Sequence, residues 1–81
     1  MKGFTLPLPK EYPKVGEVYK HYKGDNYEVV GLALHSNDDI WMVVYKPLYE
    51  HADAQMFTRP LDEWSEIVSH DGEVLRRFTL I

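Results

Sequence analysis

The sequence predicts an all-β fold, a single small antiparallel barrel that is highly bent and carries one short helical turn. Three observations indicate this fold. Short segments rich in aromatic and β-branched residues alternate with turn residues such as Gly24-Asp25. Strands joined by such tight turns form antiparallel sheets. The 81 residues, 44% of them hydrophobic, leave room for one core and no second domain.

Residues 1–16 are predicted to form an extended N-terminal arm that precedes a β-barrel domain at 17–81. Pro7, Pro9 and Pro13 fix φ, remove backbone donors and disfavour helix at the residue before each. We expect the arm to cover apolar surface of the domain; a free tail or a peptide ligand for another protein is the alternative. The apolar residues that alternate along the arm are Phe4, Leu6, Leu8 and Tyr12.

The first hairpin is predicted from two strands, 17–22 and 26–35, that flank the tight-turn dipeptide Gly24-Asp25. A two-residue loop fixes the register of the strands on either side of it. The pairs expected across this hairpin are Tyr22 with Tyr27, His21 with Glu28, and Tyr19 with Val30.

The remaining strands follow from similar signals. Residues 36–39 form a second turn by composition, and 40–49 form a third strand that ends near Pro47. Residues 50–55 show no strand period and are expected to form a loop. A short fourth strand is expected at 56–59.

The C-terminal part is predicted to hold the helical turn and a last hairpin. Pro60 stops the fourth strand and favours a helical turn at 61–64, which places acidic residues at the positive end of the turn. Strands at 67–69 and 74–78 then surround the turn 70–73.

The predicted register makes both faces of the sheet apolar. One face therefore lines the barrel interior, and the other face must be covered. The candidates for this cover are the arm, the Trp64 turn, a second subunit or a ligand. The first face comprises Val18, Tyr22, Tyr27, Val29, Ala33, Ile40, Met42 and Val44, and the second comprises Tyr19, His21, Val30, Leu32, Leu34, Trp41, Val43 and Tyr45.

Charge and cysteine content restrict the class of partner and the compartment. The formal net charge is −4, the lysines are dispersed, and Arg76 and Arg77 would point to opposite faces of a strand, so nucleic acid is not an expected partner. The prolines of residues 1–13 interrupt any apolar run, so no signal peptide or membrane span is expected. The absence of cysteine indicates a cytoplasmic protein.

The runs YKHYKGDNYEVVGLALHS, VVYKPLY, RPLDEW and RRF occur in that order along the chain. Together, over residues 16–79, they resemble the small bacterial domain of unknown function numbered 1653. The resemblance implies an SH3-like β-barrel in a bacterial cytoplasmic protein. It implies no activity.

The four histidines do not predict a metal site. His21, His35, His51 and His70 lack the spacing of a metal-binding motif, and no metal or other cofactor is expected. The expected register instead places the carboxylate of Glu28 opposite His21. The simpler interpretation of His21 is a structural histidine whose hydrogen bonds are made within the strand pair.

The sequence favours a non-enzymatic binding module, for a peptide segment or a small polar ligand, because an apolar floor with polar tips is typical of such sites. It contains no nucleophile motif and no Gly-rich phosphate loop. The alternatives are an enzyme or accessory subunit that uses His21 and Glu28 in acid–base roles, or a structural homodimer. Arg59 either binds a ligand carboxylate or phosphate through two N–H groups, or has the simpler role of bridging barrel carbonyls or pairing with Asp62 or Glu63. The candidate ligand-binding residues are Tyr19, His21, Glu28, Tyr45, Arg59 and Trp64.

Overall fold

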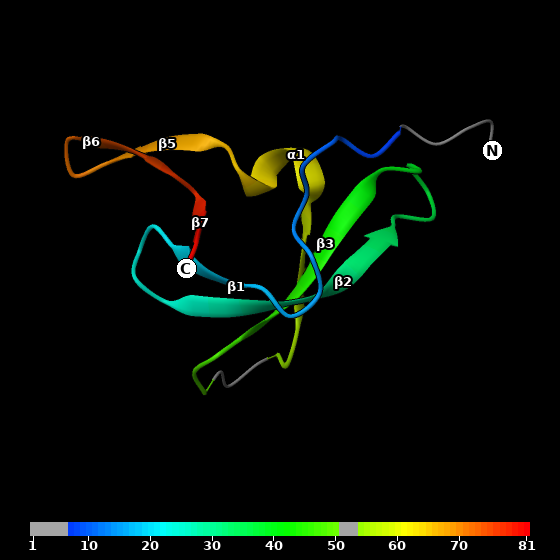
Figure 1. Ribbon diagram of the computed structural model, residues 1–81, viewed down its shortest axis with the longest axis horizontal. Coiled ribbons are helices and arrows are strands. Elements are labelled where there is room, and N and C mark those ends of the chain that lie inside the picture. Colours follow the sequence, from blue (N-terminus) through cyan, green and yellow to red (C-terminus); the bar gives the residue numbers. More distant parts are fainter. Residues whose placement is uncertain (1–6, 51–53) are drawn as a thin grey trace.

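The structure, a computed structural model, describes residues 7–50 and 54–81 (Figure 1). The described residues form strands joined by short turns, with one helical turn between the fourth and fifth strands. The elements are β1 (Val18–His21), β2 (Asn26–Leu34), β3 (Trp41–Pro47), β4 (Phe57–Pro60), α1 (Leu61–Trp64), β5 (Ile67–His70), β6 (Glu73–Arg76) and β7 (Phe78–Leu80).

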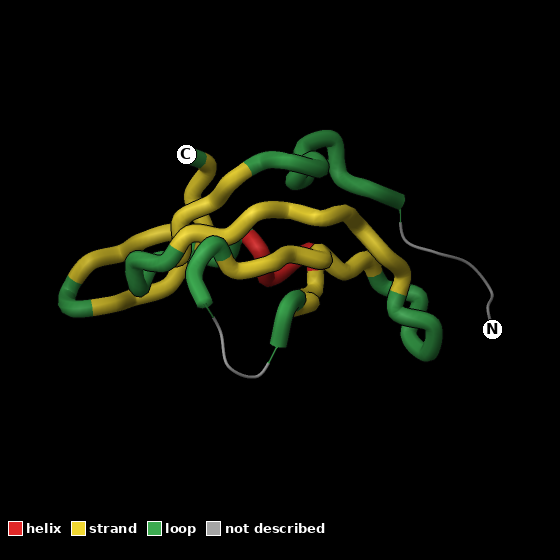
Figure 2. The backbone as a smooth tube through the Cα atoms, turned by 90° about the horizontal axis from the view of Figure 1, so that it is seen from below, coloured by secondary structure: helices red, strands yellow, loops and turns green. Residues whose placement is uncertain are grey.

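The all-β prediction is confirmed, but the closed barrel is not. Five antiparallel strands form one sheet in the order β4-β3-β2-β1-β7, and β5 pairs with β6 in a separate hairpin. Within the described ranges no backbone pairing joins β4 to β7. The sheet is strongly curved, with α1 near its middle, and the β5–β6 hairpin extends beyond one end (Figure 2). Side chains link the two sheet edges: the Arg59 guanidinium of β4 lies 5.9 Å from the Phe78 ring of β7.

The register predicted for the first hairpin is wrong by three residues. Tyr19, not Tyr22, is the partner of Tyr27. The His21 N–H donates to the carbonyl oxygen of Asp25 (2.8 Å), which leaves a three-residue connection between them. Gly24 ends that connection at a φ of +112°, a conformation that glycine adopts without steric cost. A three-residue loop with glycine in this position is a common hairpin alternative to the two-residue loop that we predicted.

A β-bulge in β2 also changes which residues share a face of the sheet. Val29 pairs with Tyr45 whereas Gly31 pairs with Val44, so Val30 is an extra residue in β2. The corrected register places Tyr27 on the same face as Tyr45, and Val30 turns outward with 40% of its surface exposed. The prediction that both faces are apolar is therefore wrong for the first half of β2.

The core is one aromatic and aliphatic cluster on the concave face of the sheet. Trp64 of α1 and Phe78 of β7 stack with ring centroids 3.8 Å apart and planes 6° apart. Each fully buried side chain of this size contributes roughly 1.5–3 kcal/mol relative to an exposed one. The buried members are Val29, Val43, Tyr45, Trp64 and Phe78, and Tyr19, Tyr27, Leu32, Phe57 and Leu61 pack against them.

The local predictions for the C-terminal part are confirmed in their main features. The helical turn covers residues 61–64 as predicted, and no helix among the described residues is long and apolar enough to cross a membrane. In the last hairpin Asp71 and Gly72 both have positive φ, as a two-residue type I′ turn requires. The predicted strand at 74–78 instead divides at Arg77, whose N–H donates to the Glu66 carbonyl oxygen (2.8 Å), and the chain then turns to pair with β1 as β7.

The arm runs beside the sheet as extended chain without helix or strand over residues 7–16. Pro13 is buried, Tyr12 is half-buried, and the Gly16 N–H donates to the carbonyl oxygen of Val29 (2.9 Å). Phe4 and Leu6 lie outside the described residues, so their covering role stays a prediction.

Candidate ligand-binding groove

A groove of about 820 Å³ lies between the arm, β1, α1 and β7. Its walls combine prolines from the arm with aromatic side chains from the folded domain. We call it the aromatic groove. Its aromatic lining residues are Tyr12, Tyr19, Trp41, Trp64 and Phe78, and its prolines are Pro7, Pro9, Pro13 and Pro60.

Tyr19 connects the groove to the arm through a chain of hydrogen bonds. Its hydroxyl donates to Oε1 of Glu17 (3.0 Å), and the same oxygen accepts the backbone N–H of Lys14 (2.8 Å). Burial, and then the Glu17 contact, raises the pKa of Tyr19 to about 12. The Lys14 N–H is the main cause that lowers the pKa of Glu17, because it stabilises the carboxylate. The arm is thus held to β1 by a charged acceptor.

Trp64 forms part of the groove floor while belonging to the core. Its side chain is 3% exposed, and the Tyr19 ring meets it edge-on at 5.3 Å. Its Nε1–H has no hydrogen-bond partner among residues 7–50 and 54–81. Buried indole N–H groups are usually satisfied, so this donor marks an unusual position beside the groove.

A second, smaller hollow of about 320 Å³ lies where β1 meets β6 and β7. We call it the basic hollow because its charged lining residues are all basic. Arg76 and Thr79 line both this hollow and the aromatic groove. The residues of the basic hollow are Lys20, His21, Tyr22, Leu75, Arg76 and Thr79.

His21 is held by a backbone contact and by neighbouring rings. Its Nδ1 accepts the Lys23 N–H (3.1 Å), and its ring lies 4.4 Å from the Tyr22 ring and 5.0 Å from that of Phe78. Burial lowers the pKa of His21, as do the nearby cations of Arg59, Lys23 and Arg77, while Asp25 opposes them weakly. The imidazole is therefore biased towards its neutral form, with the proton on Nε2.

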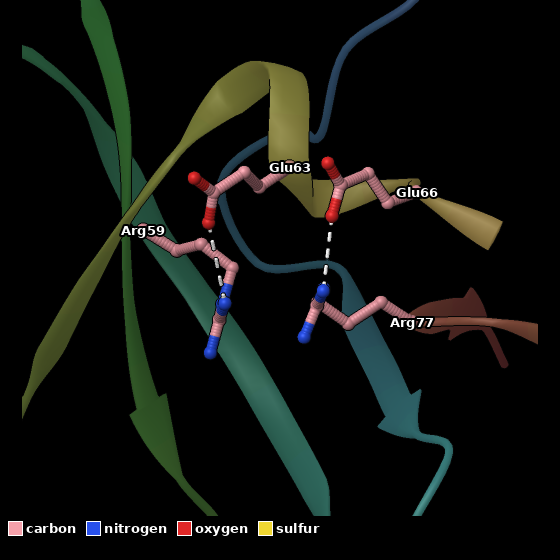
Figure 3. Close-up of polar contacts among 4 residues, drawn as sticks. All are labelled: Arg59, Glu63, Glu66 and Arg77. Carbon is pink, nitrogen blue, oxygen red and sulfur yellow. Dashed lines mark hydrogen bonds and ion pairs between the residues drawn. The ribbon is translucent and has the colours of Figure 1, made fainter. Parts of the chain in front are cut away.

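The side chains of two arginines, Arg59 and Arg77, extend towards one another from opposite sides below α1 (Figure 3). Nη1 of Arg59 lies 3.5 Å from Oε1 of Glu63, and Nη2 of Arg77 lies 2.9 Å from Oε1 of Glu66. The first pair is the plain ion pair that the sequence offered as the simpler role of Arg59. The Nε atoms of both arginines are buried without a partner in the part of the chain that the structure describes. These pairs tie both sheet edges to the segment that contains α1.

The six predicted site residues do not share one surface. Tyr19 and Trp64 meet in the aromatic groove, His21 lines the basic hollow, and Arg59 joins the sheet edges. Tyr45 is only 5% exposed and lies in the core.

Glu28 lies on the other face of the sheet from His21. It pairs with Val18 across the ladder, and its Oε1 lies 3.9 Å from Nζ of Lys46. The predicted pairing of His21 with Glu28 is therefore wrong, for the same reason of register as the Tyr22–Tyr27 pair.

Sequence reasoning missed Lys20, Arg76 and Thr79 as members of a site. They are brought together by the pairing of β1 with β7, in which Lys20 is the partner of Thr79. The only available signal was the excess of basic over acidic residues in each short segment, which did not reveal their proximity. Among the described residues no three His, Cys, Asp or Glu side chains are grouped to hold a metal ion; His51 lies outside them.

The comparisons with known proteins identify one family. The family model described as "Protein of unknown function (DUF1653)" matches residues 17–80. The crystal structure of a protein of that family from Bordetella bronchiseptica is similar to this chain, with a TM-score of 0.76 and 38% sequence identity. The similarity covers 88% of this chain and 86% of the other. No curated protein matches the sequence.

Proposed function

Because this chain belongs to the DUF1653 family of proteins of unknown function, we propose its function from geometry: it is a non-enzymatic module whose aromatic groove binds an extended peptide segment. The observation that carries the proposal is the groove itself. Its 820 Å³ fall within the range of pockets that enclose ligands, and aromatic rings form much of its lining. Aromatic grooves on small β-domains commonly bind extended, proline-containing peptides.

The polar rim of the groove supports a peptide more than a small ion. Lys14 and Arg76 supply positive charge, while Glu11, Glu17 and Asp62 supply negative charge. A rim with both signs suits a chain that presents alternating N–H and C=O groups, because both kinds of partner are available.

The geometry supports an enzyme less well. The acid–base alternative requires His21 and Glu28 to act together, and they lie on opposite faces of the sheet. General acid–base groups must come within hydrogen-bond reach of the same reacting atoms, directly or through one water. The absence of cysteine supports a role in the cytoplasm.

An array of immobilised peptides, with and without proline, tests the proposal. The strongest binder is then titrated into the purified protein by calorimetry. We expect Tyr12→Ala to weaken binding by about tenfold, as the loss of one aromatic contact predicts. Leu48→Ala removes an exposed apolar side chain outside the groove and should bind as the wild type does.

Each other result has a defined meaning. Failure of every peptide, or equal binding by the Tyr12 variant, would contradict the proposal. Equal binding of a free amino acid would favour a small polar ligand instead. A dimer in light scattering that dissociates with Tyr12→Ala would favour the homodimer, with a second copy in the groove.

A further inference from the structure

We infer that the basic hollow binds a single oxyanion group, a carboxylate or a phosphate. The inference goes beyond the proposed function and does not rest on it, because the hollow shares only Arg76 and Thr79 with the aromatic groove and its other four lining residues are separate. Three observations carry it: the donors that surround the hollow, the absence of acidic residues from its lining, and the lack of carboxylate partners for its cations.

The donors come from three elements that are distant in sequence. Lys20 of β1 and Thr79 of β7 are direct partners across the antiparallel pair, so their side chains stand on the same face. Arg76, at the end of β6, supplies a guanidinium from the other side of the hollow. An ammonium, a hydroxyl and a planar fork of N–H groups are the donors that bind carboxylate and phosphate oxygens.

The cations of the hollow are not neutralised by the protein. None of the lining residues is acidic. Arg59, Arg77 and Lys46 each have a carboxylate within 4 Å, whereas Lys20, Lys23 and Arg76 have none among the described side chains. A protein with a net charge of −4 thus keeps three unpaired cations in or beside one small hollow.

The size of the hollow favours one group over a polyanion. About 320 Å³ accommodate a small ligand, and the free cations surround this one position. Binding along a nucleic-acid backbone requires a series of cations that contact successive phosphates. A single carboxylate or phosphate is the ligand that the geometry fits.

Titration of the full chain with sodium phosphate, sodium acetate or sodium chloride at constant ionic strength tests the inference. Amide resonances of Lys20, Arg76 and Thr79 report the binding. We expect phosphate or acetate, but not chloride, to produce saturable shifts of these resonances, because their oxygens accept hydrogen bonds from the donors of the hollow.

Matched variants make the test specific. Lys20→Gln and Arg76→Gln should each weaken binding about tenfold or more, as expected for the loss of a charge-assisted hydrogen bond. Lys46→Gln removes the same charge from β3, outside the lining of the hollow, and should leave binding unchanged. A larger response to phosphate identifies a phosphate group as the ligand, and a larger response to acetate a carboxylate. Shifts no greater than those in chloride, or equal weakening by the Lys46 variant, would overturn the inference.

Discussion

Replacing Phe78 tests whether stacking across the gap between the sheet edges holds the fold together. Phe78 is 2% exposed, stacks on Trp64 of α1 and lies under the Arg59 guanidinium of β4. Truncation of such a ring to alanine costs about 3–5 kcal/mol. The whole stability of an 81-residue domain is roughly 4–12 kcal/mol, so Phe78→Ala should remove at least about a quarter of it.

The milder variant Phe78→Leu makes the effect measurable. It retains apolar volume but loses the stack, and should cost about 1–2 kcal/mol. For a domain of this size the melting temperature should then fall by roughly 5–15 °C. The control is Leu80→Ala, in the same strand but at a residue that is 52% exposed.

Denaturation followed by far-UV and near-UV circular dichroism measures both quantities. The near-UV signal of the Trp64 stack should weaken in Phe78→Leu even where the far-UV spectrum is retained. If Phe78→Ala unfolds at the same denaturant concentration as Leu80→Ala, the edges of the sheet are not held by this stack, and our account of the core is wrong.

Three further predictions concern single residues. Gly24→Ala should destabilise the protein by about 1–2 kcal/mol, because the φ of Gly24 is +112°. Gly31→Ala should cost less, because Gly31 has open space around it and no positive φ. Equal losses of stability in urea denaturation would refute the turn assignment. The pKa of Glu17 is lowered from 4.5 in the folded state, so its contribution to stability is present above pH 4.5 and is lost as pH falls through the folded pKa. Glu17→Gln should remove this part of the acid dependence of the free energy of unfolding. An unchanged pH profile would contradict the contact with Lys14. The pKa of Tyr19 is raised from 10.0 to about 12, so its contribution to stability is present below pH 10 and is lost as pH rises towards 12. In an ultraviolet titration, Tyr19→Phe should show one fewer tyrosine that ionises late. An unaltered titration curve would exclude the assignment.

Local signals in the sequence determined the elements with short-range causes. The helical turn follows from Pro60 and the residues after it, and the last hairpin follows from Asp71-Gly72, which tolerate positive φ. The all-β class follows from the aromatic and β-branched content of the segments between turns. Each of these features depends on neighbours within a few residues.

Only the tertiary structure decided the register, the faces and the sites. Gly24-Asp25 is compatible with a two-residue or a three-residue loop, and packing of Tyr19 and Tyr27 against the core selects the longer one. The bulge at Val30 depends on how β2 matches β3, which turn residues do not encode.

The convergence of Lys20 with Arg76 and Thr79 depends on the pairing of the first strand with the last. No local pattern marks that pairing, because it is favourable only once the aromatic core between the strands has formed. The sequence by itself therefore determined the class and the local turns, while the groove and the basic hollow arise from contacts between segments that are distant along the chain.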